Sequence, residues 1–176
     1  DDSNLKIKKN LLNNFKLFKK IDLQHNYFCK GNIENRILNY LFEKNGSKIY
    51  DDYAHHPTEI ASVLEGVKKV YRKKKIVSIF QPHRISRLKN LKLEFSKCFK
   101  NSDVVILCPI YKAGENIKLG FTYDTFARLI IKNSKVSLIK VNDQLELKKL
   151  INKIAYGENI YIAMGAGSIS NWVRNL

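Results

Sequence analysis

The sequence lacks any apolar run of the roughly 18 to 20 residues that a membrane-spanning helix requires, so we expect no membrane partner. Cysteine is also scarce. The three cysteines, Cys29, Cys98 and Cys108, are odd in number and widely spaced, which argues against a disulfide framework. Cys98 and Cys108 lie in apolar stretches, where a cysteine behaves as a small core residue. Free thiols are typical of a reducing compartment, and we expect the cytoplasm.

Several motifs of nucleotide binding and covalent catalysis are missing. No GxxxxGKS/T phosphate loop occurs anywhere in the chain. There is no GxSxG nucleophile turn, and no cysteine has a plausible base beside it. We therefore expect the chain to serve the substrate side of a reaction, without a triphosphate cradle of its own.

Acidic residues are few: 16 Asp and Glu stand against 32 Lys and Arg, which gives a formal net charge of +16. Such a balance can mark a nucleic-acid-binding protein, whose arginines and aromatic residues gather on one surface. Here lysine greatly outnumbers arginine, and only residues 72–75 form a dense basic run. Abundant Asn and Ile fit an AT-rich coding sequence as the source of the lysines. We predict no nucleic-acid partner; the alternative, a nucleic-acid-binding module, predicts binding that weakens steeply with salt.

The sequence does have enough apolar residues for a core, since 44% are hydrophobic. From about residue 48, short β-branched segments alternate with segments of helical pattern. The expected strands lie at 48–53, 75–80, 103–110, 135–141 and 159–165, and the expected helices at 57–71, 86–99, 122–132, 143–155 and from 168 onward. Five successive βα units predict an α/β fold with a doubly wound, mostly parallel sheet.

Residues 1–46 do not follow this alternation. The stretch 5–18 has the pattern of a helix with Leu5 and Phe15 on one side, and the sequence from there to Phe42 is irregular. We expect residues 1–46 to be the end of a preceding domain with a hinge, and residues 47–176 to form the α/β domain. Because the chain begins abruptly, we expect it to be a piece of a longer protein.

Polar and glycine-rich residues follow four of the five expected strands, at the point where each strand ends. They are Asp51–Asp52–Tyr53, Gln81–Pro82–His83–Arg84, Pro109–Ile110–Tyr111 with Ala113–Gly114–Glu115 behind it, and Gly165–Ala166–Gly167–Ser168. In an open α/β sheet, ligands bind beyond the carboxyl ends of the strands. This convergence predicts a binding site at that edge.

The turn DDYAHHPTEI carries the densest chemistry at this edge. Pro57 suits the first position of a helix, whose amino end then directs its partial positive charge toward the edge. Adjacent histidines point in different directions, so His55 and His56 are unsuited to bind one metal ion. At least one of them either contacts an anionic ligand or caps the helix. Asp51 and Asp52 accept hydrogen bonds either from ribose hydroxyls or from backbone groups.

The second cluster is QPHRISR, residues 81–87. Arg84 and Arg87 are three residues apart and share a face if the segment is helical. Two guanidiniums beside a helix amino end suit a carboxylate or a phosphate, although paired arginines also occur on solvated helix faces. The GAGS turn either permits close backbone approach to a ligand or is simply a tight turn.

Four segments together resemble the C-terminal domain of the Mur ligases. They are DDYAHHPTEI, FQPHRISRLKNL about thirty residues later, DVVILCPIYKAGE and MGAGSI. They run from about residue 48 to the end in the family's order and with similar spacing. The first two are highly specific in combination, and the FQPHR form is similar to the branch of the family that adds L-alanine. The resemblance implies a Rossmann-like domain that closes over a central ATPase domain and brings the amino acid.

The resemblance also implies a reaction, ATP-dependent amide bond formation in peptidoglycan precursor synthesis. The carboxylate of UDP-N-acetylmuramate becomes an acyl phosphate, the amino group of L-alanine attacks it, and phosphate leaves. Magnesium neutralises the phosphates during transfer. ATP and magnesium would be bound largely by domains absent from this chain. The resemblance implies two such domains, one for the UDP-sugar and a central ATPase domain with a phosphate loop.

Roles for individual residues follow from the resemblance. The expected catalytic residues are His55, His83 and Arg84. The expected substrate-binding residues are Tyr53, Arg84, Arg87, Gly165 and Gly167. The expected nucleotide contacts are Asp52 and Lys20, and no residue is expected to bind a metal ion.

This chain departs from the family pattern at the hinge. The family carries a segment of the type Gly-Val-Lys-Arg-Arg-Phe, and the nearest stretch here is 18–22, with Lys19 and Lys20 where arginine is expected. Lysine keeps the charge but loses the fork geometry of arginine.

Two alternatives to the L-alanine branch stay open: the related ligase that adds a murein tripeptide, and a stand-alone, non-catalytic Rossmann-like domain that binds a small anion.

Overall fold

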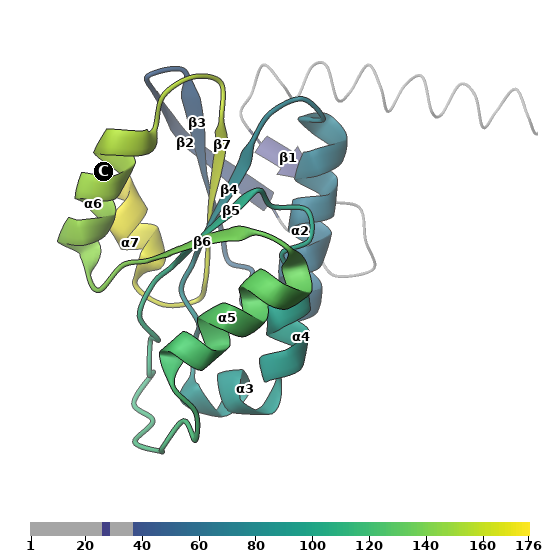
Figure 1. Ribbon diagram of the computed structural model, residues 1–176. Coiled ribbons are helices and arrows are strands. Elements are labelled where there is room, and N and C mark those ends of the chain that lie inside the picture. The colour runs from purple at the N-terminus through teal and green to yellow at the C-terminus, as the bar shows by residue number, and fades with distance from the viewer. Residues whose placement is uncertain (1–25, 29–36) are drawn as a thin grey trace, which may run out of the picture.

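The structure is a computed structural model that describes residues 26–28 and 37–176, and Figure 1 shows its arrangement. The strands are β1 (Asn26–Phe28), β2 (Ile37–Lys44), β3 (Ser47–Asp52), β4 (Ile76–Phe80), β5 (Val104–Leu107), β6 (Ser137–Lys140) and β7 (Ile160–Met164). The helices are α2 (Pro57–Val70), α3 (Ile85–Asn90), α4 (Lys92–Lys97), α5 (Tyr123–Ser134), α6 (Gln144–Ile154) and α7 (Ile169–Arg174). Within the described ranges no helix has the length and apolar character to cross a membrane. The predicted helix at 5–18, Lys19, Lys20 and Cys29 lie outside those ranges.

The strands form one sheet in the order β1-β2-β3-β7-β4-β5-β6. The five strands from β3 to β6 in that order run parallel, whereas β1 and β2 are antiparallel additions at one edge. The predicted α/β fold with a mostly parallel sheet is therefore confirmed, and all five predicted strands are present. The predicted helix at 86–99 is wrong as a single element, because the chain leaves helical geometry at Leu91, between α3 and α4.

Strand β2 corrects the prediction of an irregular segment that runs to Phe42. It pairs with β3 across a two-residue turn, Asn45–Gly46, in which the two φ values are 50° and 83°. Two positive φ values are what a type I′ hairpin turn requires, and Asn-Gly is its preferred sequence. The hairpin crosses the predicted domain boundary at residue 46, so β2 joins the same sheet as the strands that follow.

Two hydrophobic clusters cover the two faces of the sheet, and Figure 1 shows the helices divided in the same way. Helices α2, α3, α4 and α5 pack on one face with Tyr50, Phe80 and Leu107 from the strands. Helices α6 and α7 pack on the other face with Ile79 and Ile106. Neighbouring residues of one strand thus belong to opposite clusters, as the two-residue period of a strand requires.

The winding of the sheet reverses at β7. The loops after β3 and β4 lead to α2 and α3 on one face, whereas the loop after β7 leads to α7 on the other. Neighbouring strands whose connections leave to opposite faces form a topological switch point, and ligands bind beside it in α/β sheets. The fold therefore brings the carboxyl ends of β3, β7 and β4 together at this point.

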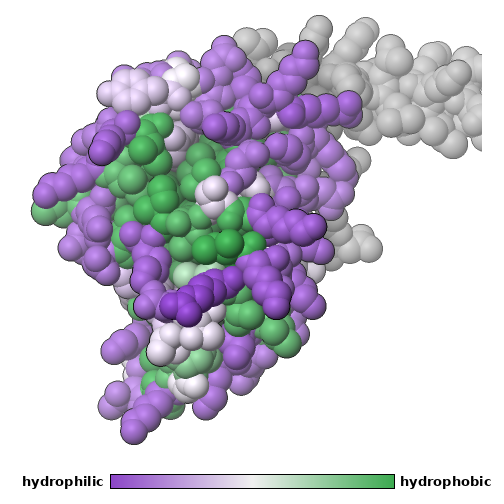
Figure 2. Space-filling view, viewed as in Figure 1, coloured by the Kyte–Doolittle hydropathy of each residue, from purple (hydrophilic) through white to green (hydrophobic). Residues whose placement is uncertain are grey.

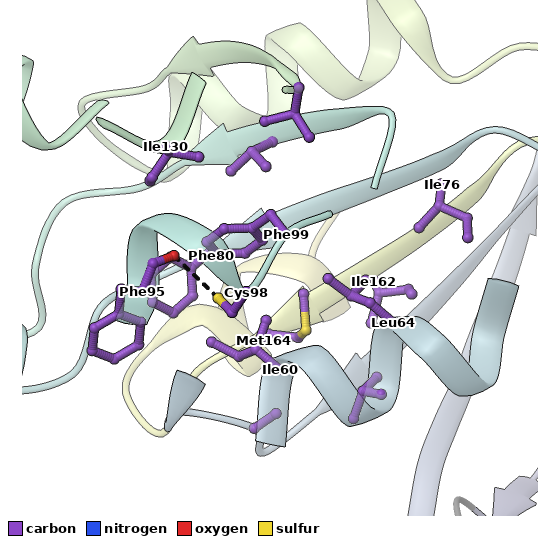
Figure 3. Close-up of a cluster of buried hydrophobic side chains, with 14 of the residues drawn as sticks. Ile60, Leu64, Ile76, Phe80, Phe95, Cys98, Phe99, Ile130, Ile162 and Met164 are labelled. Carbon is purple, nitrogen blue, oxygen red and sulfur yellow. Dashed lines mark hydrogen bonds between the residues drawn. The ribbon is translucent and has the colours of Figure 1, made fainter. Parts of the chain in front are cut away.

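The core beside β4 is aromatic, as the close-up in Figure 3 shows. The ring centroid of Phe80 lies 5.5 Å from that of Phe95 and 5.2 Å from that of Phe99. The Cys98 thiol donates to the Phe95 carbonyl over 3.2 Å, and burial raises the pKa of Cys98. Burial also raises the pKa of Cys108 to about 12. Both thiols are therefore unreactive core groups, as predicted from their apolar surroundings.

Strand β6 forms one edge of the sheet. Its Ile139 is 36% exposed, and Figure 2 shows hydrophobic side chains gathered in the middle of the face on which β6 lies. Lys140 follows on the same strand, and its ammonium group pairs with Asp124 of α5. A lysine on an edge strand disfavours pairing with the strand of another chain.

Candidate functional site at the carboxyl edge of the sheet

Strand β3 ends in two buried carboxylates with different partners. Asp51 Oδ2 accepts a hydrogen bond from Ser170 Oγ at 2.5 Å and pairs with Arg174 Nη2 at 3.1 Å. These contacts fasten α7 to the end of β3. Asp52 is 3% exposed, and its Oδ1 accepts the Ala54 N–H at 2.7 Å. The backbone-capping alternative is therefore present at Asp52, and contact with a ribose stays a prediction.

The two histidines after this turn have separate surroundings. His56 is the N-cap of α2: its ring accepts the Thr58 N–H at 3.4 Å. Glu59 Oε2 accepts the backbone N–H groups of both His55 and His56 at 3.0 Å, which completes a capping box. His55 Nδ1 lies 2.9 Å from the Tyr53 carbonyl oxygen and 3.5 Å from Glu59 Oε2. Of the two histidines, His56 is thus the capping residue.

Four rings form a row along the carboxyl edge. Tyr53, which is 66% exposed, contacts His55 with ring centroids 5.1 Å apart. His55 meets His83 edge to face at 5.8 Å. His83 in turn stacks on Tyr111 at 5.5 Å, with the two ring planes 10° apart. The row joins the loops after β3, β4 and β5, and it brings together three of the predicted site residues.

Arg87 determines which nitrogen of His83 accepts a hydrogen bond. Its Nη1 donates to His83 Nδ1 over 3.2 Å, so Nδ1 presents a lone pair. Burial lowers the pKa of His83, and electrostatic interactions with Arg87, His55 and Arg84 lower it further, against an opposing effect of Glu115. A neutral imidazole that accepts at Nδ1 carries its proton at Nε2. His83 is therefore a neutral hydrogen-bond donor at this edge.

Arg84 has a backbone conformation that residues other than glycine rarely adopt. Its φ is 69° and its ψ is 133°, and α3 begins one residue later. The condition under which Arg84 and Arg87 would share a helix face, a helical segment that includes both, is therefore not met. The Arg84 N–H donates to the Tyr111 carbonyl over 2.8 Å, which holds the residue outside the helix. Arg87 nevertheless reaches His83 through its Nη1, and the charges of both arginines lower the pKa of His83. Backbone strain of this kind is concentrated at functional sites.

Gly165 and Gly167 are accounted for by close packing. A Cβ atom at Gly165, where φ is 154°, would lie 2.7 Å from the Gln81 carbonyl oxygen. At Gly167 it would lie 2.5 Å from Tyr111 Cγ and 2.6 Å from Gln81 Oε1. Gln81 Oε1 also accepts the Ile169 N–H at 3.0 Å, which holds the start of α7. The tight turn is therefore established, and contact of these glycines with a substrate stays a prediction.

Glu115 fastens the loop after β5 to the start of α3. Its carboxylate accepts the Ser86 hydroxyl at 2.5 Å and the Ser86 N–H at 2.9 Å. The hydrogen bond from the Ser86 hydroxyl is the largest cause that holds the pKa of Glu115 below its usual range. The hydrogen bond from the Ser86 N–H and the charge of Arg84 lower this pKa further. The loop therefore supports the segment that carries Arg84 and Arg87.

Glu115→Gln is expected to destabilise the chain at neutral pH and to lose this effect in acid. A carboxyl group with a depressed folded-state pKa stabilises the fold above its unfolded pKa of about 4.3. That stabilisation disappears as the pH falls from there through the lower folded-state pKa. Urea unfolding of the variant and the parent chain, at neutral pH and at about pH 3, measures the difference. Glu94→Gln, at an exposed position of α4, is the control. An equal difference at both pH values would contradict the assignment.

Three residues of this edge carried no predicted role: Gln81, Tyr111 and Glu115. Each lies at or shortly after the end of an expected strand, and that position was the signal available for them. The partners of Asp51 had no such signal. Ser170 and Arg174 lie 119 and 123 residues away in the sequence, and no local pattern relates them to Asp51.

A family model described as Mur ligase, glutamate ligase domain matches residues 38–167. The chain belongs to the Mur ligase family. The matched part runs from β2 to the turn after β7, so it contains every residue of the ring row and both arginines. The resemblance predicted from DDYAHHPTEI and FQPHRISRLKNL is thereby confirmed.

A curated relative aligns with most of this Mur ligase chain. The UDP-N-acetylmuramate–L-alanine ligase of Pelagibacter ubique is 54% identical over 160 residues, which are 89% of this chain and 34% of that protein. The chain thus spans about a third of the length of this relative.

Solved structures of Mur ligases have the same fold. The UDP-N-acetylmuramate–alanine ligase of Thermotoga maritima matches with a TM-score of 0.59 at 27% identity, over 78% of this chain and 28% of that one. A murein peptide ligase of Psychrobacter arcticus matches with a TM-score of 0.63 at 18% identity, over 82% of this chain and 30% of that one. At such low identity the second likeness concerns the fold alone.

Proposed function

We propose that this chain is the C-terminal domain of a UDP-N-acetylmuramate–L-alanine ligase, an ATP-dependent enzyme of peptidoglycan precursor synthesis. The observation that carries the proposal is the 54% identity over 160 residues to a ligase of that name. The carboxyl edge supports it chemically. Arg87 donates to the neutral imidazole of His83 there, and the charge of Arg84, the next residue along the chain, also lowers the pKa of His83, a combination that suits a small carboxylate substrate.

Arg84 and Arg87 are the proposed partners of the L-alanine carboxylate. Held there, the amino acid would present its amino group to the acyl phosphate of the sugar substrate. His83 would donate from Nε2 to an oxygen on which negative charge develops before phosphate leaves. His55 and Tyr53, next along the ring row, are proposed to lie beside the alanine and the reacting phosphate.

ATP supplies the phosphoryl group that activates the carboxylate of UDP-N-acetylmuramate. Two positions of this chain, Asp52 and Lys20, are proposed for nucleotide contact. Asp52 is buried and its Oδ1 accepts the Ala54 N–H, so its carboxylate also has a backbone-capping role. Among the described residues, no three His, Cys, Asp or Glu side chains are grouped to hold a metal ion. We propose that other domains bind most of the ATP and the magnesium.

The proposal requires a UDP-sugar domain and a central ATPase domain in addition to this one. Residues 1–46 are proposed to hold the end of the central domain and the hinge, with residues 47–176 as the C-terminal domain, to whose sheet β2 also contributes. The proposed compartment is the cytoplasm, in keeping with the free, buried thiols of Cys98 and Cys108. The proposed partners are L-alanine, UDP-N-acetylmuramate and those domains, without nucleic acid or membrane.

A ligation assay on the complete native protein tests the proposal. The protein is supplied with ATP, magnesium, UDP-N-acetylmuramate and either L-alanine or a murein tripeptide, and the product is weighed by mass spectrometry. The expected product contains L-alanine and appears with release of phosphate. A product with the tripeptide alone would assign the chain to the related recycling ligase. No product, from a native protein whose intact mass is close to 20.5 kDa, would favour the stand-alone anion-binding domain.

A further inference from the structure

Tyr111 occupies a central position at the carboxyl edge. It follows β5, and its main chain contacts the residues on both sides of His83. The Tyr111 N–H donates to the Pro82 carbonyl and the Tyr111 carbonyl accepts the Arg84 N–H, both over 2.8 Å. Its ring stacks on His83 with the planes 10° apart. Main chain and side chain of one residue therefore both hold the segment that carries His83.

The Tyr111 side chain is also closely packed against Gly167. A Cβ atom at Gly167 would lie 2.5 Å from Tyr111 Cγ and 2.7 Å from Tyr111 Cβ. Only glycine leaves room for the ring at this distance. Tyr111 is nevertheless 42% exposed, so part of it reaches the solvent at the edge. Tyr111 thus contacts both the turn after β7, at Gly167, and His83 after β4.

We infer that Tyr111 is a positioning residue for His83: its stacked ring holds the imidazole where Nδ1 meets Arg87 and Nε2 faces the substrate. The inference deepens the proposed function and rests on it for the last clause. The stacking itself rests on the ring geometry alone. Arg87 Nη1 donates to His83 Nδ1 over 3.2 Å and to the His83 carbonyl over 3.4 Å. Only the first of these contacts reaches the imidazole, so the stacked ring is a second restraint on its orientation.

The charged and titratable groups around His83 come from three loops. Arg84 and Arg87 belong to its own loop and helix, His55 comes from the loop after β3, and Glu115 comes from the loop after β5. Burial is the largest cause that lowers the pKa of His83, ahead of these charges. A ring stacked on one face of the imidazole contributes to this burial, so removal of the ring exposes His83 to water.

The test is an NMR pH titration of the His83 ring in the 176-residue chain, which needs no ligase activity. Tyr111→Leu is expected to raise the pKa of His83 toward its ordinary value of about 6.5. Tyr111→Phe keeps the ring and is expected to titrate as the parent chain does. Tyr156→Leu, at a tyrosine that is 60% exposed beyond the end of α6, is the matched control and is expected to change nothing.

An unchanged His83 titration in Tyr111→Leu would overturn the inference, whatever the enzyme does. If that variant does not fold, cross-relaxation between the Tyr111 and His83 ring protons of the parent chain decides instead, and its absence would also overturn the inference. In the complete ligase, Tyr111→Leu is expected to lose up to about a hundredfold in kcat/KM for L-alanine, with a shifted pH profile. Tyr111→Phe is expected to retain both. If the ligation assay fails but Tyr111→Leu raises the pKa of His83 as expected, only the proposed function is refuted.

Discussion

Replacing Arg84 by glycine is expected to reduce kcat/KM of the complete ligase for L-alanine by about a hundredfold or more, without weakening the fold. Loss of one member of a hydrogen-bonded charge pair typically costs about 2–5 kcal/mol of binding, and about 1.4 kcal/mol corresponds to a factor of ten. Arg84 is exposed, and its main-chain hydrogen bonds to Tyr111 and Leu88 can also form in glycine. Loss of the guanidinium and its contact with the substrate is therefore the expected cause.

The expected stability of Arg84→Gly follows from the backbone conformation at this residue. With φ at 69° and ψ at 133°, a residue that has a side chain is strained, typically by about 1–3 kcal/mol. Glycine relieves this strain and loses roughly 0.4–1 kcal/mol through the greater freedom of the unfolded chain. The free energy of unfolding is therefore expected to stay equal or to rise by up to about 2 kcal/mol. Urea unfolding of the 176-residue chain measures it.

Two variants serve as controls for Arg84→Gly. Arg84→Lys keeps the charge and loses the planar fork, so it is expected to retain part of the activity and none of the gain in stability. Lys89→Ala removes an exposed cation from α3 and is expected to leave both quantities unchanged. Full activity in Arg84→Gly would remove Arg84 from the site. A marked fall in stability would show that the surrounding contacts do not impose strain at this residue.

Burial made the parallel sheet predictable from the sequence. β4 and β7 are runs of five buried residues each, and such runs between polar turns indicate strands covered on both faces. Because helical segments alternate with these runs, successive strands are joined by helices and run parallel in the sheet. The carboxyl ends must meet at one edge, which is why His83, Tyr53 and Gly165 could be grouped without knowledge of any contact.

Strand β2 and the contacts between distant segments were not predictable in the same way. β2 has an irregularity between Tyr40 and Phe42, which interrupts the two-residue period by which a strand is recognised. Arg84 lies just before α3, where its N–H donates to the Tyr111 carbonyl. Asp51 accepts a hydrogen bond from Arg174, 123 residues away in the sequence. These arrangements depend on which strands are neighbours, and the insertion of β7 between β3 and β4 decides that.

Gly165→Ala is expected to lower the free energy of unfolding by about 2–4 kcal/mol. Two physical costs combine at this position. The backbone has a φ of 154°, and the new Cβ would lie 2.7 Å from the Gln81 carbonyl oxygen. Gln81 cannot easily withdraw, because its N–H donates to the Met164 carbonyl over 3.0 Å where β4 and β7 are paired. Relief of the clash therefore requires the two central strands to separate locally.

Comparison of Gly165→Ala with Gly114→Ala separates the steric part of this cost from the backbone part. Gly114 also has a positive φ, 81°, but a Cβ there would have no neighbour within 4 Å, so the expected loss is the backbone term alone, about 1–2 kcal/mol. Urea unfolding of the 176-residue chain compares the two variants. Equal losses would contradict the close approach of Gln81 to Gly165. A normal fold in Gly165→Ala, combined with a higher KM for the sugar substrate in the complete ligase, would instead establish Gly165 as a substrate contact. The larger loss expected for Gly165→Ala would mean that this glycine is required first for the packing that brings β4 and β7 together, and that any effect on the substrate follows from it.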